Sequence, residues 1–199
     1  MKLSYVIKKI RFAFIFSAKK RGEFLRKKGG LKEIGENIFF QPRKLPGDPE
    51  LLRFKSNIAV ASGVVFVTHD VMHYIFNNIE KNTADYHMGC IEVGNNVFIG
   101  ANSVILPNVK IGDNCIIAAG SIVTKDVPSG SVVAGNPAKN IGDFYSVLEE
   151  RKREFESRKS KSREQIVNEL WEDFEKGKNR KVLEKQTSYW EVNCAIRHR

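Results

Sequence analysis

The sequence predicts an all-β solenoid, a coil of short strands, and three observations support this prediction. Between residues 93 and 128 an aliphatic residue returns at every sixth position, which is neither the helical nor the strand period: Val93, Ile99, Ile105, Ile111, Ile117 and Val123. The fourth place of each hexad holds a residue type that tolerates positive φ: Asn96, Asn102, Asn108, Asn114, Gly120 and Asp126. The fifth place holds a side chain small enough for the inside of a corner: Val97, Ser103, Val109, Cys115, Ser121 and Val127. Each short extended run therefore ends in a turn of fixed angle, with one corner per hexad.

The same period is present upstream, but it is interrupted. Repeats begin at Ile34 with IGENIF, and residues 41–51 (QPRKLPGDPEL) then carry three prolines, which predict a loop. The period resumes at Phe54, Val60 and Phe66, and His69 takes a fourth, corner place. Histidine is enriched at left-handed φ, so a purely structural role is one hypothesis for His69.

Two stretches lie outside the repeats. From 70 to 91 the period vanishes, and the sequence predicts a long loop protruding from the coil; long loops on rigid scaffolds are usually functional. Residues 129–142 are predicted to be a final irregular coil. Two apolar stripes at three-and-four spacing follow in residues 143–199, and they predict helices separated by SRKSKS.

The N-terminal segment, residues 1–30, holds nearly all of the net charge. It contains ten Lys or Arg and only Glu23, so it supplies +9 of the formal +10. The remainder is nearly neutral, which argues against a general nucleic-acid-binding surface. Apolar residues between the basic clusters of residues 1–28 predict an amphipathic helix or helical pair. One interpretation is a cap on the first coil; the other is contact with an anionic membrane surface. The FAFIF run is too short to span a bilayer.

The repeats resemble those of the hexapeptide-repeat acyltransferases. This resemblance implies a left-handed parallel β-helix, in which three hexads make one triangular coil and residues eighteen apart stack. It also implies a homotrimer. We therefore expect an N-terminal basic helical cap at 1–30, a left-handed β-helix at 31–142 with a protruding loop at 70–91, and a C-terminal helical tail at 143–199.

The loop that begins at THD and the later stretch NVFIGANSVILPNVKIGDNCIIAAGSIVTKDVPSGSVVAGNPAK are similar to the sugar and polysaccharide O-acetyltransferases of that family, and the upstream stretch PGDPELLRFKSNIAVASGVVFVTHD is similar to the capsule and lipopolysaccharide subset. The resemblance implies acetyl-CoA as donor and His69, at the start of the protruding loop, as general base. A sugar hydroxyl is too weak an acid to attack a thioester unaided, so an imidazole must take its proton. Candidates for orienting His69 or for binding the acceptor are Asp70, Gln41, His73, His87 and Phe98.

The resemblance also implies where acetyl-CoA binds. In the family the pantetheine arm runs along the outside of the last coils between subunits. Small residues there let the arm approach backbone amides, and basic residues suit the nucleotide phosphates. The matching positions are Ala101, Ala119, Thr124, Lys125 and Lys139.

Several alternatives remain open. N-acetylation of an amino-sugar nucleotide, and acetylation of serine or of a xenobiotic, differ from sugar O-acetylation in the acceptor. The zinc-dependent γ-type carbonic anhydrases share the fold, but the spacing of His69, His73 and His87 does not match their ligand set, so we expect no metal. A trimeric β-helix scaffold without activity would leave His69 unused.

Three cysteines at unrelated spacings favour reduced thiols, and we expect a cytoplasmic protein, with the inner membrane face as one location.

Overall fold

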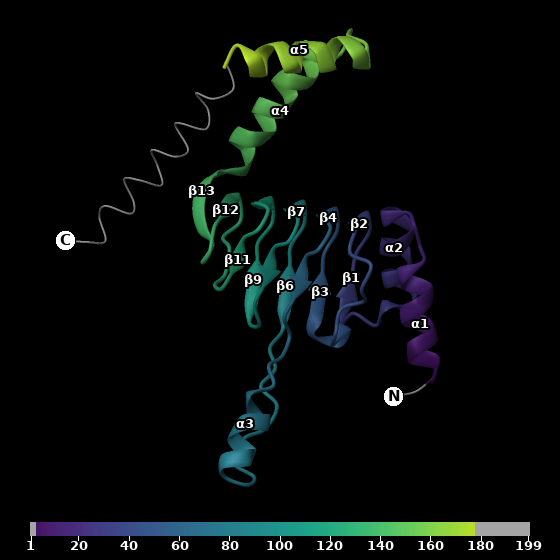
Figure 1. The fold of residues 1–199 in the computed structure, drawn as a ribbon, viewed down its shortest axis with the longest axis vertical. Helices are drawn as coiled ribbons and strands as arrows, with labels where there is room; N and C mark the ends of the chain where they lie inside the picture. The colour runs from purple at the N-terminus through teal and green to yellow at the C-terminus, as the bar shows by residue number, and fades with distance from the viewer. Residues whose placement is uncertain (1–2, 178–199) are drawn as a thin grey trace, which may run out of the picture. The chain divides into compact units, whose positions relative to one another are not determined.

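The structure, a computed structural model, describes residues 3–177 (Figure 1). The chain divides into two compact units between Val147 and Leu148, and each is described by itself. The end of the predicted tail, residues 178–199 with Cys194, lies outside the described residues.

The first unit is built on three parallel sheets that the chain visits in turn, so that each strand pairs with the equivalent strand of the next coil (Figure 1). The first sheet contains β1 (Glu33–Ile34), β3 (Leu52–Phe54), β6 (Ile91–Val93) and β9 (Val109–Ile111). The second contains β2 (Ile38–Phe40), β4 (Ile58–Val60), β7 (Val97–Ile99), β10 (Cys115–Ile117), β12 (Ser131–Ala134) and β13 (Lys139–Asp143). The third contains β5 (Val65–Phe66), β8 (Val104–Ile105) and β11 (Ile122–Val123). This order describes a three-sided coil.

The strand register confirms the predicted stacking. Val93 pairs with Ile111, Ile99 with Ile117, and Ile105 with Val123, each eighteen residues apart. All six are at most 1% exposed, and the column continues upstream through Phe54, Val60 and Phe66. The small fifth-place residues are also buried: Val97, Ser103, Val109, Cys115, Ser121 and Val127. The core is therefore one continuous stack of aliphatic layers inside the coil.

Most of the predicted corners have the expected left-handed backbone. Asn96, Asn102, Asn108, Asn114 and Gly120 have φ between 55° and 71°. Within residues 3–177, every non-glycine residue with positive φ is an asparagine, so the predictions for Asp126 and His69 are wrong. At Asp126 the coil shortens, since Ile111 bridges to Val127, sixteen residues on, and the Asp126 carboxylate accepts the Lys110 N–H at 2.8 Å. The corner hypothesis for His69 therefore has no support in its backbone.

Two segments are more regular than the sequence predicts. Residues 129–142 are not irregular: β12 adds to β10 in parallel, and β13 folds back antiparallel to β12. Ser131, Val132 and Val133 are buried, which explains why this stretch extends the sheet after the hexad period has ended. The protruding loop contains helix α3 (Met72–Ile79), and the Asp70 carboxylate accepts the Met72 N–H at 3.0 Å at its first turn.

The N-terminal segment packs on the end of the coil opposite β13 (Figure 1). It forms α1 (Leu3–Ala13), α2 (Ala18–Phe24) and a π-helical turn, η1 (Leu25–Gly29). The Phe12 ring is fully buried, 5.5 Å from the ring centre of Phe24 and 6.1 Å from that of Phe40. Aromatic packing therefore joins these helices to the first coil.

The second unit contains two helices, α4 (Phe144–Arg158) and α5 (Arg163–Glu175). The first residues of α4, up to Val147, belong to the first unit. Helices were predicted in this region. Ser162 caps α5 together with Gln165 in a reciprocal capping box. Neither helix buries a residue. Within residues 3–177 no helix combines the length and hydrophobicity needed to cross a bilayer.

We predict that Gly22→Ala destabilises the first unit. A Cβ at this position would lie 1.9 Å from the Ile38 carbonyl oxygen, a backbone atom that cannot swing aside, so α2 would have to move off β2. Overpacking costs about 1–3 kcal/mol or more, and it opposes the roughly 1 kcal/mol that Ala gains over Gly in a helix. We expect a lower midpoint in thermal or urea unfolding. Glu23→Ala, at the exposed neighbouring position, is the control. A gain in stability for Gly22→Ala would contradict the packing of α2 on β2.

Candidate active site

His69 lies at the base of the protruding loop and is held by a carboxylate from another part of the chain. Its Nδ1 is 2.5 Å from Asp48 Oδ2, and the Thr68 hydroxyl donates to the same oxygen at 2.7 Å. The His69 and Asp48 side chains are 31% and 28% exposed, so the pair is sheltered but reachable from solvent. This is an imidazole with one nitrogen fixed and the ring accessible.

The proline-rich loop explains how Asp48 reaches His69. In the described chain the first coil supplies strands to the first and second sheets only, and residues 41–51, with the 3₁₀ turn η2 (Pro49–Leu51), occupy the third side. Asp48 therefore lies one coil before His69 at the same corner. Gly47 also lies against the ring, since a Cβ there would be 3.8 Å from His69 Cε1.

The electrostatics of Asp48 determine which ring nitrogen of His69 carries the proton. The hydrogen bond from Thr68 lowers the pKa of the Asp48 carboxyl, and that from His69 adds to the effect against the opposing effect of burial. Asp48 is therefore ionised near neutral pH and can only accept. The Nδ1 of His69 must donate to it, which leaves the lone pair of the neutral imidazole on Nε2.

Asp70 was the sequence-based candidate for orienting His69, and the structure gives that contact to Asp48. The Asp70 carboxylate accepts the Met72 N–H, and its own N–H donates to the His87 carbonyl at 3.2 Å. The second bond belongs to the stem of the loop, where His69 bridges Met88 antiparallel and the Gly89 N–H donates to the Thr68 carbonyl. The stem fixes the backbone of His69, and Asp48 fixes its ring.

Tyr86 joins the histidines of the loop. Its ring centre is 5.3 Å from that of His69 and 4.5 Å from that of His73. Tyr86 is 45% exposed, whereas His73 Nδ1 is buried without a hydrogen-bond partner in the described residues. The structure thus brings two of the predicted residues, His69 and His73, together around a tyrosine.

The other acceptor-side candidates lie apart from this cluster. The Gln41 side-chain oxygen accepts from the Ser62 N–H at 3.0 Å and from its hydroxyl at 3.2 Å, at the corner between the second and third sheets. Phe98 lies in β7 between Ala59 and Ile116, with 44% of its surface exposed. His87 is exposed, and its backbone carbonyl accepts the Asp70 N–H.

The cofactor candidates fall on two corners. Ala101 and Ala119 are stacked, with the Gly120 N–H donating to the Ala101 carbonyl, in the same column as Ser62. Thr124 and Lys125 follow β11 and share the corner of His69, two coils away, or about 10 Å at the usual strand spacing. Lys139 begins β13 and is exposed. Within one chain these residues do not converge on a single cleft.

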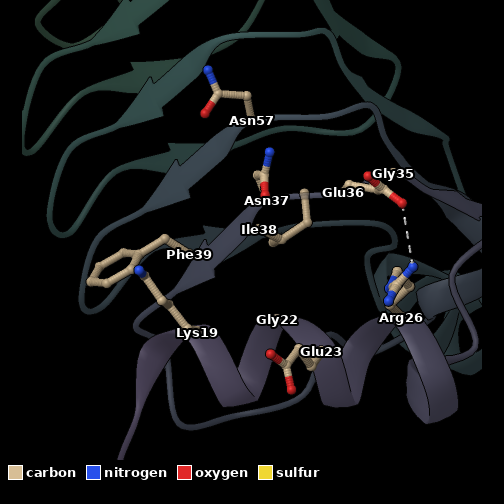
Figure 2. A pocket seen from close by; sticks show the side chains of 10 residues that line it. All are labelled: Lys19, Gly22, Glu23, Arg26, Gly35, Glu36, Asn37, Ile38, Phe39 and Asn57. Atoms are coloured by element: carbon tan, nitrogen blue, oxygen red, sulfur yellow. Dashed lines mark ion pairs between the residues drawn. The ribbon is translucent and has the colours of Figure 1, made fainter.

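A pocket of about 560 Å³ lies elsewhere, between α2 and the first coil (Figure 2). Figure 2 shows Lys19 and Phe39 at one side and the Arg26–Glu36 ion pair, 3.8 Å long, at the other. None of the predicted site residues lines it. We place the candidate active site at His69 instead, because a hydrogen-bonded imidazole is chemically competent and the mixed charges of this pocket suggest no reaction. Residues 3–177 contain no group of three His, Cys, Asp or Glu side chains arranged for a metal ion.

Sequence reasoning missed Asp48, Thr68 and Tyr86. Asp48 is twenty-one residues from His69 in an aperiodic loop, so no spacing rule connects them. The signal that could have found it is an acidic residue between two prolines, in PGDP, just before the repeats resume. Tyr86 could have been suspected as an aromatic residue near the end of the loop that His69 opens.

Comparison with known proteins shows what this chain is similar to. Residues 91–125 match the bacterial transferase hexapeptide family (six repeats). Protein CapG of Staphylococcus aureus is 52% identical over 94 residues, 47% of this chain and 54% of CapG. YvoF of Bacillus subtilis (strain 168) is 33% identical over 120 residues, 59% of this chain and 61% of YvoF. The chain thus spans a little over half the length of these relatives.

A solved galactoside acetyltransferase in complex with coenzyme A has a similar fold. It is 27% identical with a TM-score of 0.50, and the match covers 71% of this chain and 80% of that one. The repeats, the stacked parallel sheets and these relatives agree. The chain is similar, over its repeats, to the bacterial transferase hexapeptide family and, in fold, to an acetyltransferase solved with coenzyme A.

Proposed function

We propose that this protein is an acetyl-CoA-dependent O-acetyltransferase that acts on a hydroxyl of a sugar or polysaccharide precursor. The observation that carries the proposal is the Asp48–His69 pair at the base of the protruding loop, with Nδ1 bonded and Nε2 left to act as a base. The CoA complex of the galactoside acetyltransferase supports the donor and the acceptor class. We further propose that the coil is left-handed, as in the family.

The mechanism follows from the proposed tautomer of His69. Nε2 takes the proton of the acceptor hydroxyl as its oxygen attacks the acetyl carbonyl carbon. The C–S bond of the thioester then breaks, and the CoA thiolate leaves with the proton from the imidazolium. Asp48 stabilises the imidazolium that forms between these steps and keeps the ring oriented. The acetyl group passes directly to the acceptor, without an acetylated enzyme.

The donor positions suggest a site shared between subunits. The small side chains of Ala101 and Ala119 would let pantetheine approach the backbone at one corner. Thr124 and Lys125 lie at another corner, two coils after His69. A neighbouring coil that places its own corner beside His69 would bring the two sets together, with Lys139 near the phosphates. We therefore propose a homotrimer. Cytoplasmic acetyl-CoA as donor, with the exposed Cys90 and buried Cys115 as free thiols, fits a cytoplasmic site of action.

The acceptor is proposed to lie over the loop, against Tyr86. A half-exposed aromatic ring beside the catalytic base suits the apolar face of a sugar ring. His73 holds Tyr86 by ring contact, so its role is indirect. Free-thiol release from acetyl-CoA against oligosaccharides, sugar nucleotides, serine and chloramphenicol tests the acceptor class. Turnover on the last two alone would contradict the carbohydrate proposal.

We predict that His69→Ala abolishes acetyl transfer on the acceptor found in that panel. Loss of a general base typically lowers the rate by about 10²- to 10⁴-fold. The oligomer and the affinity for CoA should be retained, because the proposed donor contacts lie one or more coils away. Lys81→Ala, at an exposed position of the same loop, is the control. Thiol release and CoA titration are the measurements, and retention of more than about a tenth of wild-type turnover would refute the assignment of His69.

A second prediction separates Asp48 from Asp70. In Asp48→Asn the amide nitrogen can donate to Nδ1, which moves the ring proton to Nε2 and removes the base, so we expect kcat to fall by about 10²-fold or more. Asp70→Asn keeps a side-chain oxygen that can accept the Met72 N–H and should stay near wild type. The lowered pKa of Asp48 means that its stabilising contacts persist from neutral pH into mild acid, and that they are lost as pH falls through the folded-state pKa, below its ordinary value. Equal kcat values for the two variants would contradict the pairing seen here.

The proposed trimer gives a third measurable outcome. Light scattering or sedimentation should give about three times the chain mass of 22.6 kDa. A stable monomer with full turnover would contradict a shared donor site, and with it the placement of Lys139 near the phosphates.

A further inference from the structure

The N-terminal unit presents a ridge of exposed apolar side chains. This apolar ridge consists of Ile7, Ile10, Phe14 and Phe16, which are 48%, 53%, 70% and 80% exposed. Ile7, Ile10 and Phe14 follow three-and-four spacing and so share one face of α1 and its C-terminal extension, whereas Phe12 is fully buried on another face. The helix thus uses one aromatic residue for the core and leaves a separate stripe in water.

Buried and charged groups hold the ridge in place. Arg21 is 4% exposed, and its Nε donates to the Phe40 carbonyl at 2.9 Å. Its Nη1 donates to the carbonyl of Ile15 and, at 3.2 Å, to that of Phe16. The buried Arg21 side chain therefore fixes the turn between α1 and α2. In this turn the side chains of Phe14 and Phe16 are exposed to solvent. A surface organised in advance loses less conformational entropy on binding.

Basic side chains surround the ridge. Exposed Arg11 lies within α1, and exposed Lys19 and Lys20 follow Phe16 at the start of α2. Arg43 places its guanidinium carbon 5.3 Å from the centre of the Phe16 ring, and donates to the Ala13 carbonyl at 3.0 Å. The single acidic residue among residues 1–30, Glu23, lines the pocket on α2. The partner of this ridge must therefore be both apolar and anionic.

We propose that the apolar ridge inserts into the interface of an anionic phospholipid bilayer, with the basic side chains bound to headgroups. A bilayer surface offers both kinds of contact over an extended area. A second copy of the chain fits poorly, because pairing two ridges would bring together two segments of charge +9. Nucleic acid would engage the charges but not aliphatic residues such as Ile7 and Ile10. The coil, which packs against the buried face of α1 through Phe12, would then lie at the membrane surface.

Co-sedimentation of the full chain with vesicles tests this proposal. Vesicles of seven parts phosphatidylcholine to three parts phosphatidylglycerol should bind the protein, and pure phosphatidylcholine should bind it much more weakly. Raising the salt from about 0.1 M to about 0.5 M should weaken binding, because the Debye length falls from about 10 Å to about 4 Å. In the double variant Phe14→Ser with Phe16→Ser, the partition coefficient onto the anionic vesicles should fall roughly tenfold or more, because two aromatic rings are no longer transferred out of water.

The control is Phe155→Ser in α4, where a 63% exposed phenylalanine lies outside the basic segment. It should bind like wild type, and unfolding curves of all variants should coincide, since every replaced ring is exposed. Equal binding by the double variant and wild type, or equal binding to both vesicle types, would overturn the proposal. Lipid-free self-association that disappears in the double variant would assign the ridge to a second copy instead, and would overturn it as well.

Discussion

The fold depends on a left-handed backbone residue, most often an asparagine, at most corners of the coil. That conformation costs most L-residues about 1–2 kcal/mol, and asparagine relieves the cost by bonding locally. Here it also bonds along the coil axis: Asn57 donates to Asn96, and Asn96 to Asn114, each at 2.8 Å. Asn114 then donates to the Tyr145 hydroxyl at 3.2 Å. Because these asparagine corners share one backbone conformation, the three sheets stay in register and the aliphatic layers coincide.

The candidate active site occupies the places where this regularity stops. Asp48 comes from a proline-rich segment that replaces a strand, and His69 precedes the protruding loop, residues 70–91, which the repeats do not require. The regular coil on either side fixes both ends of each interruption. A short carboxylate–imidazole contact of 2.5 Å can thus be built from two aperiodic segments. The regular coil therefore positions the two side chains, and the aperiodic segments supply the residues of the candidate site.

The repeated part of the fold was predictable from sequence because its determinants are local. The buried columns, the asparagine corners and the first residue of the protruding loop all follow from a six-residue period. The prediction from this period was wrong at Asp126, where the coil shortens. The prediction of an irregular coil was wrong at residues 129–142, where Val132 and Val133 are buried and the sheet continues although the hexad period has ended. The partner of His69 was misassigned to its neighbour Asp70, because contacts across a coil depend on loop path rather than spacing. Donor residues such as Ala119 and Lys125 stay predictions, since within one chain they lie at separate corners of the coil.

The antiparallel strand β13 has a consequence for the end of the coil. A parallel coil ends in a row of unpaired backbone groups that would accept another coil of the same direction, from the same chain or from another molecule. By reversing, β13 covers that row with a strand whose outer edge is exposed and carries Lys139 and Asp143. Helix α2 covers the opposite end against β2. End-to-end pairing of coils through the second sheet, to which stacked β-structure is prone, is thereby opposed at both ends of that sheet.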